Sequence, residues 1–160
     1  IKRGKYMKNY LYLVVLFSMI ALGISPNRGE NKVSDKKISV SELPQAAQHL
    51  LKNYFPGTRV THCRHSQVWG EYEVKVSGGY ELGFDKKGVW EEIDSKHAPL
   101  SHRLVNLLPS GAVKYLADNY PEAKVKSMEQ RQNIYKISLS SPGVKLYFTK
   151  SGEFVKQKKD

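Results

Sequence analysis

The chain of 160 residues is 40% hydrophobic and 26% charged, which indicates a globular protein of one ordinary domain or two small modules and excludes a disordered chain. Its net charge is +11, but four of the Lys and Arg side chains lie in the first eight residues, so that 22 positive and 15 negative side chains remain in the rest. This moderate excess favours anionic surfaces in general, but no stretch clusters enough Lys and Arg for a nucleic-acid arm, and we expect no nucleic-acid partner.

Residues 1–23 have the layout of a secretory signal peptide. Lys8 precedes an apolar run from Tyr10 to Leu22, and Gly23 is the small residue before the expected cut. Met7 is the expected start of translation. Because a membrane-spanning helix needs about 20 apolar residues and this run is shorter, we expect cleavage rather than a retained anchor, and no stable membrane span afterwards. The sequence therefore predicts a periplasmic or secreted protein.

A polar stretch without periodicity at 24–39 predicts a flexible lead-in, and residues 40–95 then predict one helix and four strands. The region from Leu43 to Phe55 places its apolar residues on one side of a helix, with Pro44 in the first turn. Alternating apolar residues and Gly-containing turns predict the antiparallel strands that follow. We expect these strands at 58–65, 71–77, 80–84 and 89–94.

Residues 96–107 predict a linker, whose leucines also allow a turn or two of helix, and residues 108–160 repeat the first unit in residue type and spacing. Corresponding helix positions, 65 residues apart, are Leu43 and Leu108, Ala47 and Ala112, Leu51 and Leu116, and Phe55 and Tyr120. We interpret this pattern as an internal duplication. The predicted fold class is α+β, with two tandem repeats that each pack one helix on a four-stranded antiparallel meander. The second set of strands is expected at 124–130, 134–140, 144–149 and 153–158.

Three motifs resemble those of a known family: Leu-Pro-x-x-Ala-x-x-x-Leu from Leu43, Tyr-Glu-Val from Tyr72, and Leu-Gly-Phe-Asp-Lys-Lys-Gly-Val-Trp from Leu82. With weaker counterparts in the second unit, the chain resembles the PepSY-like, β-lactamase-inhibitor-like family of exported Bacteroidetes proteins. The resemblance implies two PepSY-like repeats and a fold like that of β-lactamase inhibitor proteins, in which tandem repeats join their sheets and offer a concave outer face to a protein partner. The residues alone leave open whether the two sheets are continuous.

If the apolar strand residues face their helices, alternation turns the charged residues to the outer face of the sheets. This face is acidic in the first repeat and basic in the second, which suits a partner of complementary polarity, and a solvated face explains the pattern equally well. Trp69 and Tyr147 are candidate exposed aromatic anchors. The predicted partner-binding residues are Trp69, Glu71, Glu73, Lys75, Lys136, Lys145 and Tyr147.

One cluster has a metal-like composition, His62-Cys63-Arg64-His65. On a strand, His62 points away from Cys63 and His65, so at most two ligands converge where zinc needs three or four. We therefore predict no metal site and no cofactor. As a lone cysteine, Cys63 is expected to pack as an apolar residue, with a disulfide to another chain as the alternative.

No nucleophile elbow, His-Glu-x-x-His helix or phosphate-binding loop occurs, so we predict no catalytic residue and no enzymatic activity. The expected function is that of an exported, non-catalytic binding module, a protein- or peptide-binding or inhibitor-like protein of the cell envelope. Its expected partner is an unknown envelope or secreted protein. The alternative is a structural or stress-related envelope protein that binds anionic glycan or lipid surfaces through its positive charge.

Overall fold

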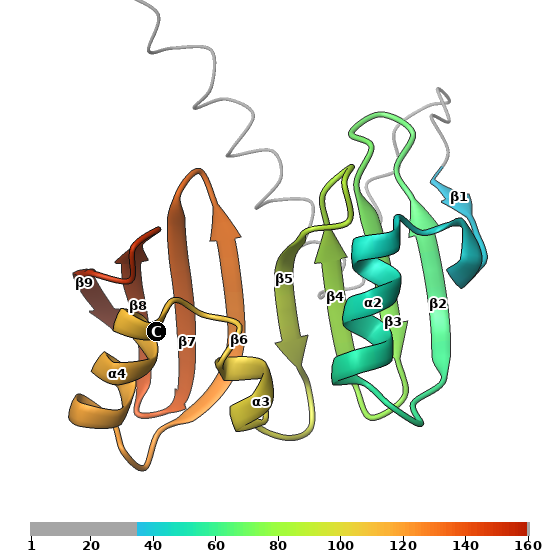
Figure 1. Ribbon diagram of the computed structural model, residues 1–160. Coiled ribbons are helices and arrows are strands. Elements are labelled where there is room, and N and C mark those ends of the chain that lie inside the picture. Colours follow the sequence, from blue (N-terminus) through green and yellow to red (C-terminus); the bar gives the residue numbers. More distant parts are fainter. Residues whose placement is uncertain (1–34, 160) are drawn as a thin grey trace, which may run out of the picture. The chain divides into compact units, whose positions relative to one another are not determined.

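The structure, a computed structural model, describes residues 35–159, and the predicted signal peptide lies outside them. In this range nine strands form one antiparallel sheet in which each strand pairs with the next along the chain (Figure 1). The strands are β1 (Lys36–Lys37), β2 (Val60–His65), β3 (Tyr72–Val76), β4 (Tyr80–Phe84), β5 (Trp90–Ser95), β6 (Lys124–Arg131), β7 (Ile134–Ser141), β8 (Gly143–Thr149) and β9 (Phe154–Lys159).

The described helices lie along one face of this sheet (Figure 1). Pro44 and Pro109 stand directly before the two longer helices, where the missing N–H of proline removes no helical hydrogen bond. The first of these two helices ends before Pro56 and Gly57. Gly57 has a φ of 73°, which lies outside the helical range and ends the helix. The helices are η1 (Val40–Glu42), α2 (Gln45–Tyr54), α3 (His102–Val105) and α4 (Ser110–Asn119).

The predicted fold class is wrong, because the strands do not form two separate four-stranded meanders. β5 pairs with β6, with Ile93 opposite Met128, and β1 adds a strand beyond β2, so residues 35–159 are mostly β and form one nine-stranded sheet. The physical reason is that a meander ending at β5 would leave unpaired backbone groups along that edge. Pairing β5 with β6 satisfies both edges and buries Ile93 and Met128 completely, each with 0% exposure.

The hydrophobic core lies between the sheet and the helices, and one row of side chains runs through it across eight strands. Every member up to Leu146 is at most 4% exposed. The row is Cys63, Val74, Leu82, Ile93, Met128, Ile137, Leu146 and Gln157, each directly opposite the next. Phe84 and Phe148 are buried beside it, as are Leu51 of α2 and Leu116 of α4. The apolar sides that strand alternation and helical spacing predict are therefore buried.

Two glycine turns let α2 and α4 approach the sheet closely. Gly88 has a φ of 80°, and a Cβ there would lie 2.9 Å from the backbone nitrogen of Ala47. Gly152 has a φ of 88°, and a Cβ there would lie 2.9 Å from the backbone nitrogen of Ala112. Both positions combine a left-handed backbone with backbone contact, a combination that only glycine allows without strain. The turns therefore fix how the two helices sit on the sheet.

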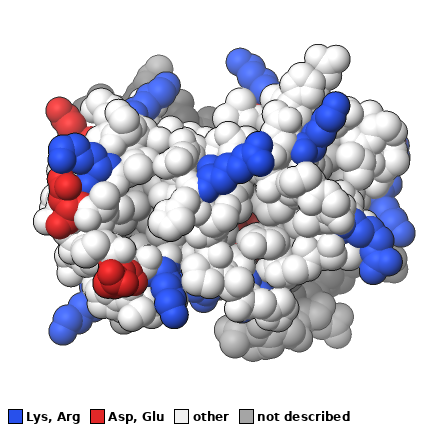
Figure 2. All heavy atoms as spheres, turned by 60° about the horizontal axis from the view of Figure 1, so that its bottom comes forward, with Lys and Arg blue, Asp and Glu red and all other residues white. Residues whose placement is uncertain are grey.

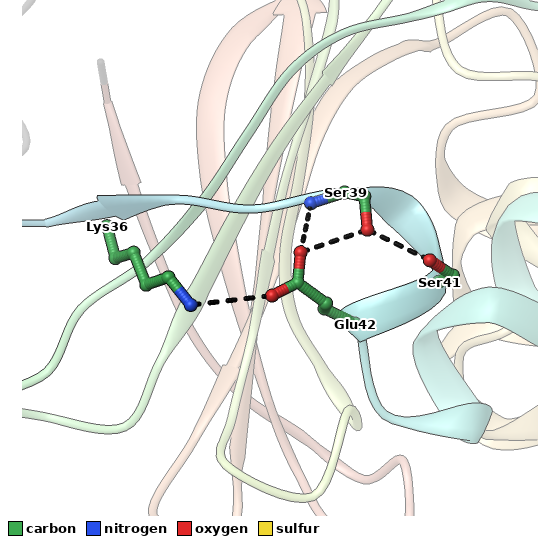
Figure 3. Close-up of polar contacts among 4 residues, drawn as sticks. All are labelled: Lys36, Ser39, Ser41 and Glu42. Carbon is green, nitrogen blue, oxygen red and sulfur yellow. Dashed lines mark hydrogen bonds and ion pairs between the residues drawn. The ribbon is translucent and has the colours of Figure 1, made fainter.

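β1 and η1 are held together by the carboxylate of Glu42 (Figure 3). Its Oε2 accepts from the backbone N–H of Ser39 at 2.7 Å and from the Ser39 hydroxyl at 2.9 Å, while Lys36 Nζ lies 3.5 Å from Oε1. The backbone hydrogen bond is the largest cause that lowers the pKa of Glu42 below its ordinary value. Part of the predicted lead-in is thus tied to the start of α2.

Candidate functional site

The outer face of the sheet, opposite the helices, carries two rows of side chains that cross β2 to β9. They arise because the antiparallel register keeps outward residues opposite one another on successive strands. The first row is Arg64, Glu73, Gly83, Glu92, Glu129, Lys136, Tyr147 and Lys156, and the second is His62, Lys75, Glu81, Asp94, Ser127, Ser138, Lys145 and Lys158. We call these two rows the outer rows.

Charge is sorted along the sheet. Strands β3 to β5 contain five acidic residues and one Lys, whereas β7 to β9 contain five Lys and no acidic residue. The acidic residues are Glu73, Glu81, Glu91, Glu92 and Asp94, and the lysines are Lys136, Lys145, Lys156, Lys158 and Lys159. Such an arrangement creates a potential that changes sign across the face, which orients a partner of complementary polarity.

Most of the acidic charge at the β3–β4 end is compensated within the protein. Lys75 Nζ lies 3.3 Å from Glu73 Oε1 and 3.0 Å from Glu81 Oε1, and Lys96 also contacts Glu81. Partial burial alone would lower the pKa of Lys75, but the hydrogen bond to Glu81 and the charge of Glu73 raise it above the ordinary value. The carboxylates of Glu73 and Glu81 are therefore already paired with lysines of the same chain.

Glu92 lies near the middle of the outer rows and has no such direct ion pair, although the charges of Arg131 and Lys136 offset part of the unfavourable energy of its carboxylate. It stands between Gly83, which has no side chain, and Glu129, whose carboxylate pairs with Lys136. Within residues 35–159, Glu92 makes no hydrogen bond or ion pair through its carboxyl group. Burial, followed by the negative charges of Glu129 and Asp94, raises the pKa of Glu92 to about 7.

The structure brings five of the seven predicted partner-binding residues into the outer rows: Glu73, Lys75, Lys136, Lys145 and Tyr147. The Lys156 ammonium lies 5.0 Å from the ring centroid of Tyr147, so the ring is an aromatic platform within the basic half. Trp69 is 47% exposed but belongs to the turn between β2 and β3, and Glu71 precedes β3. These two residues lie outside the rows.

Several residues of the outer rows were not predicted as site residues, among them Glu92, Asp94, Glu129, Lys156 and Lys158. Alternation along each strand could have placed these residues on the outer face, but the pairing of β5 with β6 is what makes Glu92 a direct neighbour of Glu129. No local sequence pattern predicts that pairing, because the linker with α3, followed by α4, separates the two strands along the chain.

The metal-like cluster is divided between the two faces. His62 belongs to the outer rows, Cys63 is 4% exposed in the core row, and His65 stacks on Tyr72 with a ring separation of 4.5 Å. Burial raises the pKa of the Cys63 thiol to about 11. No group of three or more His, Cys, Asp or Glu side chains within residues 35–159 could hold a metal ion.

The helix side has a hollow of its own, a cavity of about 410 Å³ between α3, α4 and the start of β6. Its walls are mainly apolar and include Val105, Val113, Leu116 and Val125. Figure 2 brings that end of the molecule forward and shows a largely uncharged surface, with Lys and Arg side chains around it and some Asp and Glu side chains on the left. The cavity holds no cluster of charged groups comparable to the outer rows.

Sequence and structure comparisons place the chain among known proteins. The family model described as "Putative beta-lactamase-inhibitor-like, PepSY-like" matches residues 27–82 and residues 70–156. The chain belongs to this family. The PepSY-like resemblance noted in the sequence is thereby confirmed. No curated protein matches the chain.

Solved structures of PepSY-like relatives share the fold. One, described as a "putative calcium-regulated periplasmic protein" from Bacteroides thetaiotaomicron, is 33% identical, with a TM-score of 0.70 over 78% of this chain and 96% of that one. Another, a "putative periplasmic protein" from Bacteroides vulgatus, is 32% identical, with a TM-score of 0.71 over 80% of this chain and 99% of that one. Within residues 35–159 of the present chain, no helix is long and apolar enough to cross a membrane.

Proposed function

We propose that this PepSY-like chain is an exported, non-catalytic binding protein of the cell envelope that contacts a protein or peptide through the outer rows of its sheet. The periplasmic descriptions of its solved relatives support the location. The observation that carries the binding role is Glu92, a partly buried carboxyl group in the middle of the face that makes no hydrogen bond or ion pair among residues 35–159 and whose pKa stays raised despite the charges of Arg131 and Lys136.

The position of Glu92 makes it a natural contact for a cation from another molecule. Ionising a partly buried carboxyl beside Glu129 and Asp94 is unfavourable, which is why its pKa lies near 7. A Lys or Arg side chain placed above Gly83 would lie beside Glu92 on the next strand, and it would offset this penalty in the complex alone. The basic half of the face would then meet acidic groups of the same partner.

Affinity capture from envelope extract tests the proposal. We expect the wild-type chain to retain a defined protein, and the variants Glu92→Lys and Glu92→Gln to lose most of it. Reversal of Glu73 and Lys145 should also weaken capture. The matched control is Glu122→Lys, an exposed site outside the outer rows, which changes net charge equally and should leave capture intact. Capture that is indifferent to the Glu92, Glu73 and Lys145 variants would overturn the outer rows as the binding surface.

The second candidate, an envelope protein that binds anionic glycan or lipid surfaces, is favoured by the five lysines and absent acidic residues of β7 to β9. Binding of this kind is electrostatic and is screened by salt. Sedimentation with vesicles of anionic lipid tests it: retention at low salt that disappears at high salt would support the candidate. Absence of retention at low salt would exclude it.

A further inference from the structure

The two edges of the sheet are built differently. β1 is two residues long and is tied to η1, whereas β9 has six residues, all of them exposed. Within residues 35–159, β9 has a neighbouring strand on the β8 side alone. An edge strand of this length offers a template for another chain, because alternate backbone N–H and C=O groups face away from the sheet.

The register shows which backbone groups of β9 face outward. The Thr149 N–H donates to the Glu153 carbonyl oxygen at 2.9 Å, so the backbone groups of Thr149 point toward β9. Alternation along an antiparallel strand gives Tyr147 the same direction, and Tyr147 is opposite Lys156. The next residue, Gln157, therefore turns its backbone N–H and C=O away from β8.

Charge decides which segments can approach this edge. β9 carries Lys156, Lys158 and Lys159, and no acidic residue occurs in β7, β8 or β9. Lysines on an edge strand repel basic segments and hinder pairing between copies of one protein. A second copy meets the same obstacle at its other edge, where β1 consists of Lys36 and Lys37. An acidic segment is the one that this edge attracts.

We propose that β9 accepts an extended, acidic segment of a partner protein as an added strand of the sheet. The backbone of the segment pairs with the outward groups of Gln157, and its carboxylates meet Lys156 and Lys158 on the outer face. Backbone pairing supplies the affinity in this mode of recognition, and the side chains supply the specificity. The inference rests on the proposed function and names the chemistry and position of one part of the partner.

The test uses a fluorescent ten-residue peptide that alternates Glu with Val and Thr, and a peptide with Lys in place of Glu. We expect fluorescence anisotropy to show binding of the Glu peptide alone. Gln157→Pro removes the outward N–H and should weaken binding by about tenfold or more, the worth of one hydrogen bond. Proline is tolerated on an edge strand where the N–H faces away from the sheet.

Two matched controls separate the contributions. The Gln157 side chain accepts from the Tyr120 hydroxyl at 2.6 Å, so Gln157→Ala loses that bond while keeping the N–H and should bind the peptide as the wild type does. Lys156→Glu with Lys158→Glu should reverse the preference toward the Lys peptide. The same double change at the exposed Lys52 and Lys87 should not.

Failure of this inference is distinguishable from failure of the proposed function. No binding of the Glu peptide, or equal binding by Gln157→Pro and Gln157→Ala, would overturn strand addition at β9. If capture of the envelope protein still depended on Glu92 in that case, the outer rows would stand as the binding surface without the edge. Loss of the Glu92 dependence together with intact peptide binding would support strand addition at β9 and would show that Glu92 does not contact the partner.

Discussion

Replacement of Glu92 by Gln should stabilise the folded protein at pH 8 and change little at pH 4. The pKa of Glu92 rises from its ordinary value of 4.5 to about 7 in the folded state, mainly through burial and through the facing Glu129. Between these values the folded protein binds more protons than the unfolded chain, so its stability falls as the pH rises through this window. Glutamine keeps the shape of the side chain and cannot ionise.

The magnitude follows from the two pKa values. One unit of difference between the folded and unfolded pKa is worth about 1.4 kcal/mol, so a shift from 4.5 to about 7 means that ionised Glu92 destabilises the fold by about 3 kcal/mol at pH 8. Urea unfolding of the wild type and of Glu92→Gln at pH 4 and pH 8 measures the effect. We expect the variant to gain that amount at pH 8 and to match the wild type at pH 4.

The matched control is Glu73→Gln in the same outer row. Glu73 contacts Lys75 at 3.3 Å, so removal of its charge should bring no gain at either pH. A Glu92→Gln variant that is only as stable as the wild type at pH 8, or a gain of the same size at both pH values, would refute the reasoning that the ionised Glu92 carboxylate lies in a net unfavourable environment.

Three further predictions concern the fold. Gly152→Ala should cost about 2 kcal/mol or more in urea unfolding, because its Cβ would meet the backbone of Ala112, and Gly57→Ala, with a similar φ but open space around it, should cost less; equal losses would contradict the close approach. The Cys63 thiol, with a pKa of about 11, should not react with a soluble disulfide reagent at pH 8 until urea unfolds the chain; rapid reaction in the native protein would disprove its burial. Asp85→Ala removes the acceptor of two turn N–H groups and should lower the free energy of unfolding by about 1 kcal/mol, and an unchanged value would show that the turn does not need it.

The two longer helices and the strands from β2 to β9 could be predicted because each depends on local patterns. Apolar spacing after Pro44 predicted the helix that the structure shows at Gln45–Tyr54, and alternation predicted strands close to those at Tyr72–Val76 and Ile134–Ser141. Pro and Gly marked the helix ends and turns for reasons of backbone geometry. The residues of each strand that face the core could be predicted in the same way, because alternation separates buried residues from exposed ones.

The arrangement of the strands could not be predicted in this way, and the fold class was wrong for that reason. Alternation states which side of a strand is buried and says nothing of which strand lies next to it. β1 consists of two polar residues without any alternating pattern. The pairing of β5 with β6, which places Ile93 opposite Met128, leaves no signal in either strand's own sequence. The same limit applies to the site. Lys75 and Tyr147 could be predicted one by one, but the proximity of Glu92 and Glu129 could not, because it depends on which strands pair.

The seam between β5 and β6 carries the central claim, because the outer rows exist only if these strands pair. The direct measurement is disulfide formation after Glu92→Cys and Glu129→Cys in a Cys63→Ser background. Cross-strand neighbours lie within reach of a disulfide, so mild oxidation should close the bond completely within one chain. Glu73→Cys with Glu129→Cys, on β3 and β6 of the same row, should remain reduced because strands lie about 5 Å apart and three intervals separate them. Failure of the first pair to close, or equal closure of both pairs, would contradict the continuous sheet.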